Sequence, residues 1–370
     1  MKLQRHGALA ALAITATLAM AACGSDNNAS GDGGGNADAK APSTDCAKGS
    51  LTAQGSTAQK NAMDQWIKAY QQKCSGAQIT YDGTGSGAGI QAFTSGTADF
   101  AGSDSALEDG SEQNAADKRC KGGEALDLPM VTGPIAVVYN VSGAKDLQFK
   151  PATLAKIFSG KITKWNDPAI KADNPKATLP ATPIQPVHRA DSSGTSDNFT
   201  KYLSKTAPAD WTYGNDKTWK APGGVAAKGS DGVSAKVKQT PGTIAYDEWS
   251  YATTNALSMA KIYNGSGQYT ELTANAAGKT IEGAKPVGKG DNLKLDIDYN
   301  AKVDGAYPIV LVTYEIACSK GNDAGKLDLL KSFLTYISSD SGQSALTKQG
   351  YAPLPSSVQT KVQGAIKTLS

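Results

Sequence analysis

The chain has 370 residues, with 37 Lys or Arg against 34 Asp or Glu, and a formal net charge of +3. Because it contains no basic block and no stripe of basic and aromatic residues, this balance disfavours a nucleic-acid-binding protein. The length predicts about two domains, and 39% hydrophobic residues are enough to build ordinary cores.

The first segment has the features of an export signal. Lys2 and Arg5 precede an apolar stretch that closes on small residues and Cys23, and this stretch is too short for an ordinary membrane-spanning helix. The sequence "LAMAAC", followed by glycine and serine, is similar to a bacterial lipobox. It predicts a signal peptide over residues 1–22 and a lipidated Cys23, with ordinary secretion as the alternative. The diacylglyceryl group of such lipoproteins carries the two acyl chains that stable anchoring requires.

Residues 23–45 are dense in Gly, Asn, Asp and Ser and lack apolar periodicity. We therefore expect a flexible tether rather than a domain. A tether suits a lipid-anchored domain that works at the outer face of the cytoplasmic membrane, which is the expected location.

Four further cysteines, Cys46, Cys74, Cys120 and Cys318, predict two disulfides in an exported chain. Three pairings are possible. We favour Cys46–Cys74, because these residues flank one strand–helix unit, and this choice leaves Cys120–Cys318. The spacings fit no zinc pattern and include no C-x-x-C pair, so no metal site is expected.

After the tether, strands and helices alternate along the chain. In the first part, the patterns predict strands at 50–55, 77–83, 98–104 and 123–140, and helices at 58–73 and 87–96. In the second part, they predict helices at 151–165, 196–205, 233–242 and 325–339, and strands at 184–190, 243–252 and 306–318.

This alternation predicts an α/β architecture of two lobes, each with a mixed, mostly parallel sheet flanked by helices. The long apolar segments at 129–140 and 307–318 are candidates for two hinge strands that cross between the lobes. We accordingly expect lobe I to comprise residues 46–132 and 307–370, and lobe II to comprise residues 133–306.

Catalysis is disfavoured by what the sequence lacks. His188 is the only histidine after the signal segment, and strand alternation would place it on the opposite face from Arg189. There is no G-x-S-x-G nucleophile turn and no Walker-type phosphate loop. We expect no catalytic residue, no cofactor and no metal, and hence a protein that is not an enzyme.

Three segments, at 55–58, 83–89 and 191–195, share the order strand, small or hydroxyl residues, helix. Free N–H groups at a helix start favour an anion, and parallel strands would bring the three turns to one crevice. Side-chain donors are available from Thr57, Ser86, Ser193, Thr195 and Arg189. For each turn alone, a simple N-cap is the competing interpretation.

Asp104 is an unusual residue to aim at an anion, unless that anion carries a proton. Phosphate at neutral pH can donate a hydrogen to a carboxylate, whereas sulfate cannot. A site that depends on one such hydrogen can reject the analogue lacking it by about 10⁴-fold or more. The alternative is that Asp104 only caps the following turn.

Together these residues resemble the periplasmic phosphate-binding proteins of phosphate-specific ABC importers, which are type II periplasmic binding proteins. The resemblance covers the chain from about Cys46 to its end. It is carried by "YDGTGSGAGI", "ADFAGSD", "KITKWNDPAI", "HRADSSGTS" and "KGSDGVSAKVKQTPGTIAYDEWSYA". It implies the two-lobed periplasmic-binding-protein fold, which closes on phosphate without covalent chemistry.

The resemblance also implies roles for individual residues. Thr57 and Ala58 would donate from the first turn, where the family often has an aromatic residue in place of Ala58. Ser86 would donate from the second turn, and Asp104 would accept the phosphate proton. The last segment supplies the remaining predicted ligands, Arg189, Asp191, Ser193, Gly194 and Thr195, with Asp191 orienting Arg189. Ser192 replaces a common glycine, and Asp231 is expected to make no direct contact.

The implied partners are inorganic phosphate, the permease subunits of an ABC transporter, and the membrane through the lipid anchor; we expect a monomer. The alternatives are a binding protein for another tetrahedral oxyanion, an exported phosphatase, and a sensor or adhesin built on the same fold.

Overall fold

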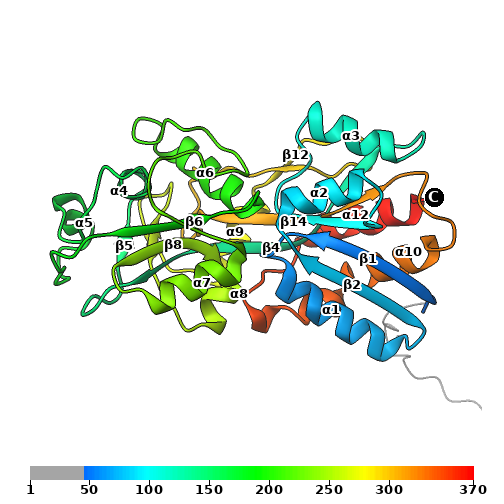
Figure 1. The fold of residues 1–370 in the computed structure, drawn as a ribbon, viewed down its shortest axis with the longest axis horizontal. Helices are drawn as coiled ribbons and strands as arrows, with labels where there is room; N and C mark the ends of the chain where they lie inside the picture. Colours follow the sequence, from blue (N-terminus) through cyan, green and yellow to red (C-terminus); the bar gives the residue numbers. More distant parts are fainter. Residues whose placement is uncertain (1–45) are drawn as a thin grey trace, which may run out of the picture. The chain divides into compact units, whose positions relative to one another are not determined.

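A computed structural model describes residues 46–370 (Figure 1). The expected signal peptide, the lipidation site Cys23 and the tether lie outside the described residues. Within the described part of the chain, no helix combines the length and apolar character needed to cross a membrane.

A nine-stranded sheet organises the fold, with the order β2-β1-β3-β14-β4-β8-β6-β7 and with β9 paired to β4. Its strands are β1 (Gly49–Gly55), β2 (Ala77–Gly83), β3 (Phe100–Ser103), β4 (Ala125–Asn140), β6 (Gln185–Arg189), β7 (Val225–Ala227), β8 (Thr243–Glu248), β9 (Ser258–Met259) and β14 (Val310–Cys318). The pairs β1/β2, β1/β3, β6/β7 and β6/β8 are parallel, and every antiparallel pair in this sheet involves β4 or β14.

Helices surround this sheet (Figure 1). They are α1 (Lys60–Lys73), α2 (Ser86–Thr94), α3 (Ser111–Arg119), α4 (Pro151–Phe158), α5 (Pro168–Asp173), α6 (Gly194–Thr206), α7 (Gly229–Gln239), α8 (Trp249–Thr254), α9 (Ala274–Glu282), α10 (Leu327–Ile337), α11 (Asp340–Ser344) and α12 (Ser356–Thr368). Two small sheets add β11-β10-β5 and β12-β13, built from Gln148–Phe149 (β5), Lys261–Tyr263 (β10), Tyr269–Thr270 (β11), Lys285–Pro286 (β12) and Leu295–Asp296 (β13).

Strand β4 runs antiparallel to its neighbours and links the parallel group β1–β3, through β14, to the parallel group β6–β8. Its residues 125–134 pair with β14, whereas residues 135–140 pair with β8. Figure 1 shows β4 and β14 between the group of β1 and β2 and the group of β6 and β8. The predicted long crossing strands are therefore present, and the mixed α/β fold is confirmed.

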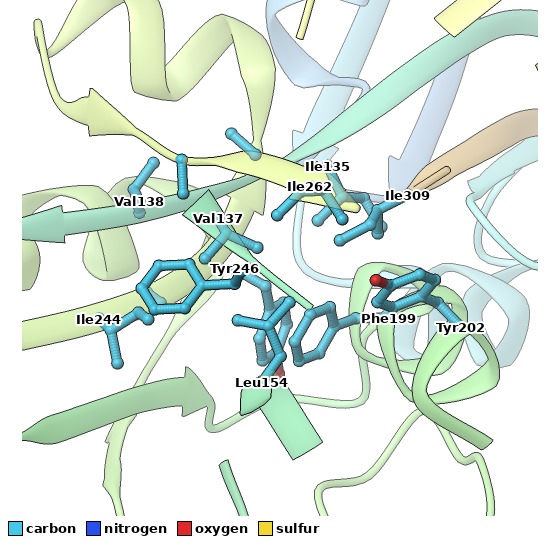
Figure 2. Packing of buried hydrophobic residues seen from close by; sticks show 14 of the residues in the cluster. Ile135, Val137, Val138, Leu154, Phe199, Tyr202, Ile244, Tyr246, Ile262 and Ile309 are labelled. Carbon is cyan, nitrogen blue, oxygen red and sulfur yellow. The ribbon is translucent and has the colours of Figure 1, made fainter. Parts of the chain in front are cut away.

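The buried hydrophobic residues form two large cores. The first, called the α6 core, contains Leu154, Phe199 and Tyr246 (Figure 2), and the rings of Phe199 and Tyr246 stack with centroids 4.4 Å apart. The second, called the α1 core, contains Trp66 and Phe100. Two cores are what two lobes require, while the lobe boundaries themselves stay a prediction.

Two predicted elements end earlier than expected. The helix predicted over 151–165 ends at Phe158, because Gly160 adopts φ +73°, a left-handed conformation that stops a helix. The strand predicted over 243–252 ends at Glu248, whose carboxylate accepts a hydrogen bond of 2.9 Å from the backbone N–H of Ser250 and starts α8.

Both favoured disulfides are present. Cys46 pairs with Cys74 across 28 residues, and Cys120 pairs with Cys318 across 198 residues. The first joins the start of the described chain to the end of α1. The second joins the end of α3 to the end of β14, so it connects segments that are distant in sequence.

The two disulfides predict different losses of stability. Because a longer closed loop restricts the unfolded chain more, Cys120→Ser/Cys318→Ser should lower the free energy of unfolding by about 5 kcal/mol and Cys46→Ser/Cys74→Ser by about 3–4 kcal/mol. Urea unfolding of both double variants measures the difference. A larger loss in the Cys46/Cys74 variant would contradict this expectation.

Candidate functional site

The first predicted turn follows β1 and leads into α1. Thr57 is 5% exposed and Ala58 is fully buried. Within residues 46–370, the backbone N–H groups of both residues donate to no other atom. Position 55 requires glycine, because its φ is +152° and a Cβ there would lie 1.9 Å from the backbone oxygen of Gly102. This turn therefore holds two buried residues whose backbone N–H groups remain available to a ligand.

The second turn places one hydroxyl between two segments. Ser86 is the first residue of α2 and is buried. Its Oγ accepts hydrogen bonds from the backbone N–H of Asp104 and from that of Gly194, both at 3.2 Å. The second and third predicted turns are thus in direct contact.

The third turn contains a buried ion pair. Arg189 ends β6 and is 3% exposed, and its Nε donates to Oδ1 of Asp191 at 2.8 Å. A second contact joins Nη2 of Arg189 to Oδ2 of Asp191, and Asp191 Oδ1 also accepts from the backbone N–H of Gly229 at 3.0 Å. The guanidinium is held in one orientation by both carboxylate oxygens.

Burial and pairing act against each other in this ion pair. Burial alone would raise the pKa of Asp191, but the hydrogen bonds and charge of Arg189 outweigh it and lower that pKa. Burial would likewise lower the pKa of Arg189, and the neighbouring Asp191 raises it instead. Both side chains are therefore charged at neutral pH.

Asp104 directly follows β3 and is 2% exposed. Its Oδ1 accepts from Oγ of Ser56, and its Oδ2 accepts from Oγ1 of Thr195 at 3.1 Å. Burial raises the pKa of Asp104 to about 6, although the hydrogen bond from Ser56 and the charge of Arg189 act to lower it. Nη1 of Arg189 donates to Oγ1 of Thr195 at 3.5 Å, so hydrogen bonds connect the guanidinium through this hydroxyl to the carboxylate of Asp104.

Some predicted residues are linked to Asp104 by short chains of hydrogen bonds, and another, Ser193, caps the start of the helix α6. Ser86, Arg189, Gly194 and Thr195 lie around Asp104 through the contacts above. Ser193 is the N-cap of α6, where its Oγ accepts from the backbone N–H of Ser196 at 3.3 Å.

The first turn is tied to residues that sequence reasoning missed. Oγ1 of Thr57 and Oγ of Ser230 lie 3.1 Å apart, and the backbone N–H of Ser230 donates to Oγ1 of Thr57 at 3.2 Å. Ser56, on Asp104, was also missed. Ser56 follows a glycine in the turn before α1, and Ser230 follows the first residue of α7, also a glycine. The signal that found Thr57 and Ser86, a hydroxyl residue beside glycine at a helix start, could have found both.

Other candidates lie away from these contacts. The ring of His188 stacks on Trp219 with centroids 5.0 Å apart, and its Nδ1 lies 3.0 Å from the backbone oxygen of Arg189. No hydrogen bond within the described residues joins Asp231 to the predicted site residues. Among residues 46–370, no group of three or more His, Cys, Asp or Glu side chains is placed to hold a metal ion.

The donor set suits one class of ligand. Backbone N–H groups at helix starts, hydroxyl groups and a guanidinium all stabilise negative charge. A single carboxylate of raised pKa among them accepts a hydrogen. The arrangement fits an oxyanion that still carries a proton.

A family model described as a PBP superfamily domain matches residues 40–341, so the chain belongs to the PBP superfamily. Over its full length the chain is 43% identical to phosphate-binding protein PstS 3 of Mycobacterium tuberculosis, with 100% of both chains covered. It is 35% identical over 325 residues to phosphate-binding protein PstS of Methanocaldococcus jannaschii, with 82% of each covered. The chain is a member of the PstS family of phosphate-binding proteins.

Solved structures agree on the fold. A phosphate-binding protein from Stenotrophomonas maltophilia is 22% identical, with a TM-score of 0.69, and the match covers 86% of this chain and 94% of that one. A periplasmic phosphate-binding protein solved with bound phosphate at pH 8.5 is also 22% identical, with a TM-score of 0.68 and coverages of 85% and 93%. The two-lobed periplasmic-binding-protein fold is thereby confirmed.

The raised pKa of Asp104 predicts a pH-dependent stability. A carboxyl group whose pKa is higher in the folded state stabilises the fold below its ordinary pKa of 3.8, and this stability is lost as the pH rises through about 6. From pH 4 to pH 7.5, Asp104→Asn should therefore lose about 2 kcal/mol less free energy of unfolding than the wild type.

Urea unfolding of both proteins without phosphate, at several pH values, measures this difference. The matched control is Asp82→Asn, which changes an exposed carboxylate on β2. Parallel pH curves for the wild type and Asp104→Asn would show that burial does not shift this group.

Proposed function

We propose that this protein binds inorganic phosphate outside the cytoplasmic membrane and delivers it to the permease of an ABC transporter. Membership of the PstS family supports the proposal, and one structural observation carries it. The buried carboxylate of Asp104 accepts from hydroxyl groups of the first and third turns, and its backbone N–H donates to Ser86 of the second. A carboxylate in such a place is useful only if the ligand brings a hydrogen.

This arrangement distinguishes phosphate from sulfate by one proton. Bound hydrogen phosphate donates its hydrogen to Asp104 and accepts from the surrounding N–H, hydroxyl and guanidinium groups. Sulfate would face Asp104 with acceptor against acceptor, so two desolvated oxygens would meet without a hydrogen between them. Asp191 offsets part of the charge of Arg189, so the pocket gains selectivity from hydrogen bonds rather than from net positive charge.

The ligand roles follow the turns. Thr57 and Ala58 donate through their backbone N–H groups, Ser86 through its hydroxyl group, and Arg189 through its guanidinium. Ser193, Gly194 and Thr195 bring the N-terminus of α6, a 13-residue helix whose dipole favours an anion. None of these groups forms a covalent bond with phosphate, so the protein acts by binding and release and is not an enzyme.

Binding operates by closure of two lobes, residues 46–132 with 307–370 and residues 133–306. Contacts such as Ser86–Gly194 and Thr57–Ser230 join elements from the two sides and would form only on closure. Phosphate favours the closed form because it touches both sides at once. The closed form is then the one that the permease recognises.

The protein works as an exported monomer that is anchored through Cys23 after removal of residues 1–22. The lipobox-like sequence before Cys23 supports this part of the proposal. Residues 23–45 link the anchor to the binding domain.

Calorimetric titration of the full chain, stripped of phosphate, tests the proposed function. The wild type should bind phosphate and bind sulfate at least about 10⁴-fold more weakly, because sulfate leaves Asp104 unpaired. Asp104→Asn should reduce that ratio by about 10²-fold or more, since an amide can donate to sulfate.

The same titrations of Asp82→Asn provide the control and should match the wild type. Equal affinity of the wild type for phosphate and sulfate would reduce the function to binding of an unspecified oxyanion. Absence of binding to either anion would reject the proposed site.

A Cys23→Ser variant tests the anchor. The wild-type chain, expressed in a bacterium that modifies lipoproteins, should partition into the detergent phase and sediment with membranes. Cys23→Ser should lose at least about 90% of that fraction, because a chain without acyl groups has no such affinity. Membrane association unchanged by the substitution would contradict a lipidated Cys23.

A further inference from the structure

Asn198 lies one turn into α6, beyond the residues proposed to bind phosphate, and is 5% exposed. Its Nδ2 donates to the backbone oxygen of Asp104 at 2.8 Å and to that of Gly194 at 2.8 Å. Its Oδ1 accepts from the hydroxyl of Tyr299 at 2.9 Å. One buried amide therefore connects two proposed site residues to a third segment.

The partners settle the orientation of this amide. Both groups that face Nδ2 are carbonyl oxygens, which only accept, and the group that faces Oδ1 is a hydroxyl with a hydrogen to donate. A flipped amide would set its oxygen against two carbonyl oxygens and would lose both of these hydrogen bonds. The surrounding groups thus fix which end of the Asn198 amide faces Asp104 and which end faces Tyr299.

Helix α6 approaches Asp104 as closely as the backbone allows. A Cβ on Gly194 would lie 2.7 Å from Cβ of Asp104, so only glycine permits this contact. On the next residues of the helix, Oδ2 of Asp197 accepts from Oγ of Ser105 at 2.6 Å. The turn after β3 is therefore held by α6 at two successive residues, through Asp104 and Ser105.

These contacts join the two hydrophobic cores. Phe199 of α6 and the ring of Tyr299 belong to the α6 core, whereas Phe100 of β3 belongs to the α1 core. Asn198 is held by Tyr299 and by Gly194 on its own side, and of its side-chain bonds within the described chain only the one to Asp104 reaches the other side. Because the amide is already oriented by its own side, little side-chain freedom is lost when that bond forms.

We propose that Asn198 is a positioning residue for phosphate binding: it holds the backbone of Asp104 against α6 in the closed form and slows phosphate release. This inference rests on the proposed function. Asn198 touches no ligand in this scheme. It fixes the backbone of Asp104, so that the carboxylate stays in place to accept from Ser56 and Thr195. It also adds a hydrogen bond between the lobes that must break when the lobes open.

The test compares rates of phosphate release. In the full chain, Asn198→Leu keeps a side chain of similar size but removes both donors. Release of radiolabelled phosphate into an excess of unlabelled phosphate should become about 10-fold faster, since one buried hydrogen bond across the closing surface is lost. The association rate should stay within about 2-fold, because the open form lacks this bond.

Thr200→Val is the matched control. Thr200 is similarly buried on α6, and its Oγ1 donates to the backbone oxygen of Ser196 at 2.8 Å, within the same helix. That Oγ1 also accepts from the backbone N–H of Asp216 at 3.4 Å, in the same predicted lobe. It should leave the release rate near that of the wild type. An equal acceleration in Asn198→Leu and Thr200→Val would overturn the inference, because it would reflect general loosening of α6.

Tyr299→Phe gives a second, milder variant that keeps the ring and removes only the hydroxyl that orients the amide. It should accelerate release in the same direction by about 3-fold. Unchanged release in both Asn198→Leu and Tyr299→Phe, with phosphate bound normally by the wild type, would reject the role of Asn198 alone. Absence of phosphate binding by the wild type would instead reject the proposed function.

Discussion

A buried carboxylate among hydrogen-bond donors is the interaction on which the rest of the site depends. Among residues 46–370, the carboxylate oxygens of Asp104 accept hydrogen bonds from the hydroxyl groups of Ser56 and Thr195 rather than from a cation. Burial raises the pKa of this carboxyl group to about 6, so its charge is tolerated only because donors from different segments converge on it. Any change that separates those segments exposes the carboxylate of Asp104 to water or leaves it buried without its donors.

The sheet explains how distant segments reach Asp104. The turns that follow β1, β2 and β3 lie on one side of β14 and β4, and the turn that follows β6 lies on the other. Because each flanking group is parallel, the ends of its strands meet at one edge, and β4 fixes the two edges relative to each other. The positive charge of Arg189 is balanced locally by Asp191, so the convergence does not rely on long-range attraction.

Sequence patterns predicted most of this arrangement. Long apolar runs located the strands β4 and β14, and turns of small and hydroxyl residues located Thr57, Ser86 and Thr195. Cysteine spacing led to the observed pairing of Cys46 with Cys74.

The failures have physical causes. The helix α12 was missed, since its buried residues, Val362, Ala365 and Ile366, lie in its second half and leave its first turn without a buried residue. Glu248 sits in an apolar, strand-like run, so its role in starting α8 depends on a side-chain hydrogen bond that periodicity does not reveal. Ser230 and Asn198 act through partners more than 90 residues away in sequence, and such contacts become visible only in three dimensions.

The disulfide between Cys46 and Cys74 also has a mechanical consequence. Strand β1 begins at Gly49 and leads directly into the first turn of the site. A pull applied to the chain before Cys46 passes through the covalent bond to the end of α1, rather than along the hydrogen bonds that hold β1 between β2 and β3. A domain held by its N-terminal end can therefore bear load at that end while the backbone of Thr57 and Ala58 stays in register.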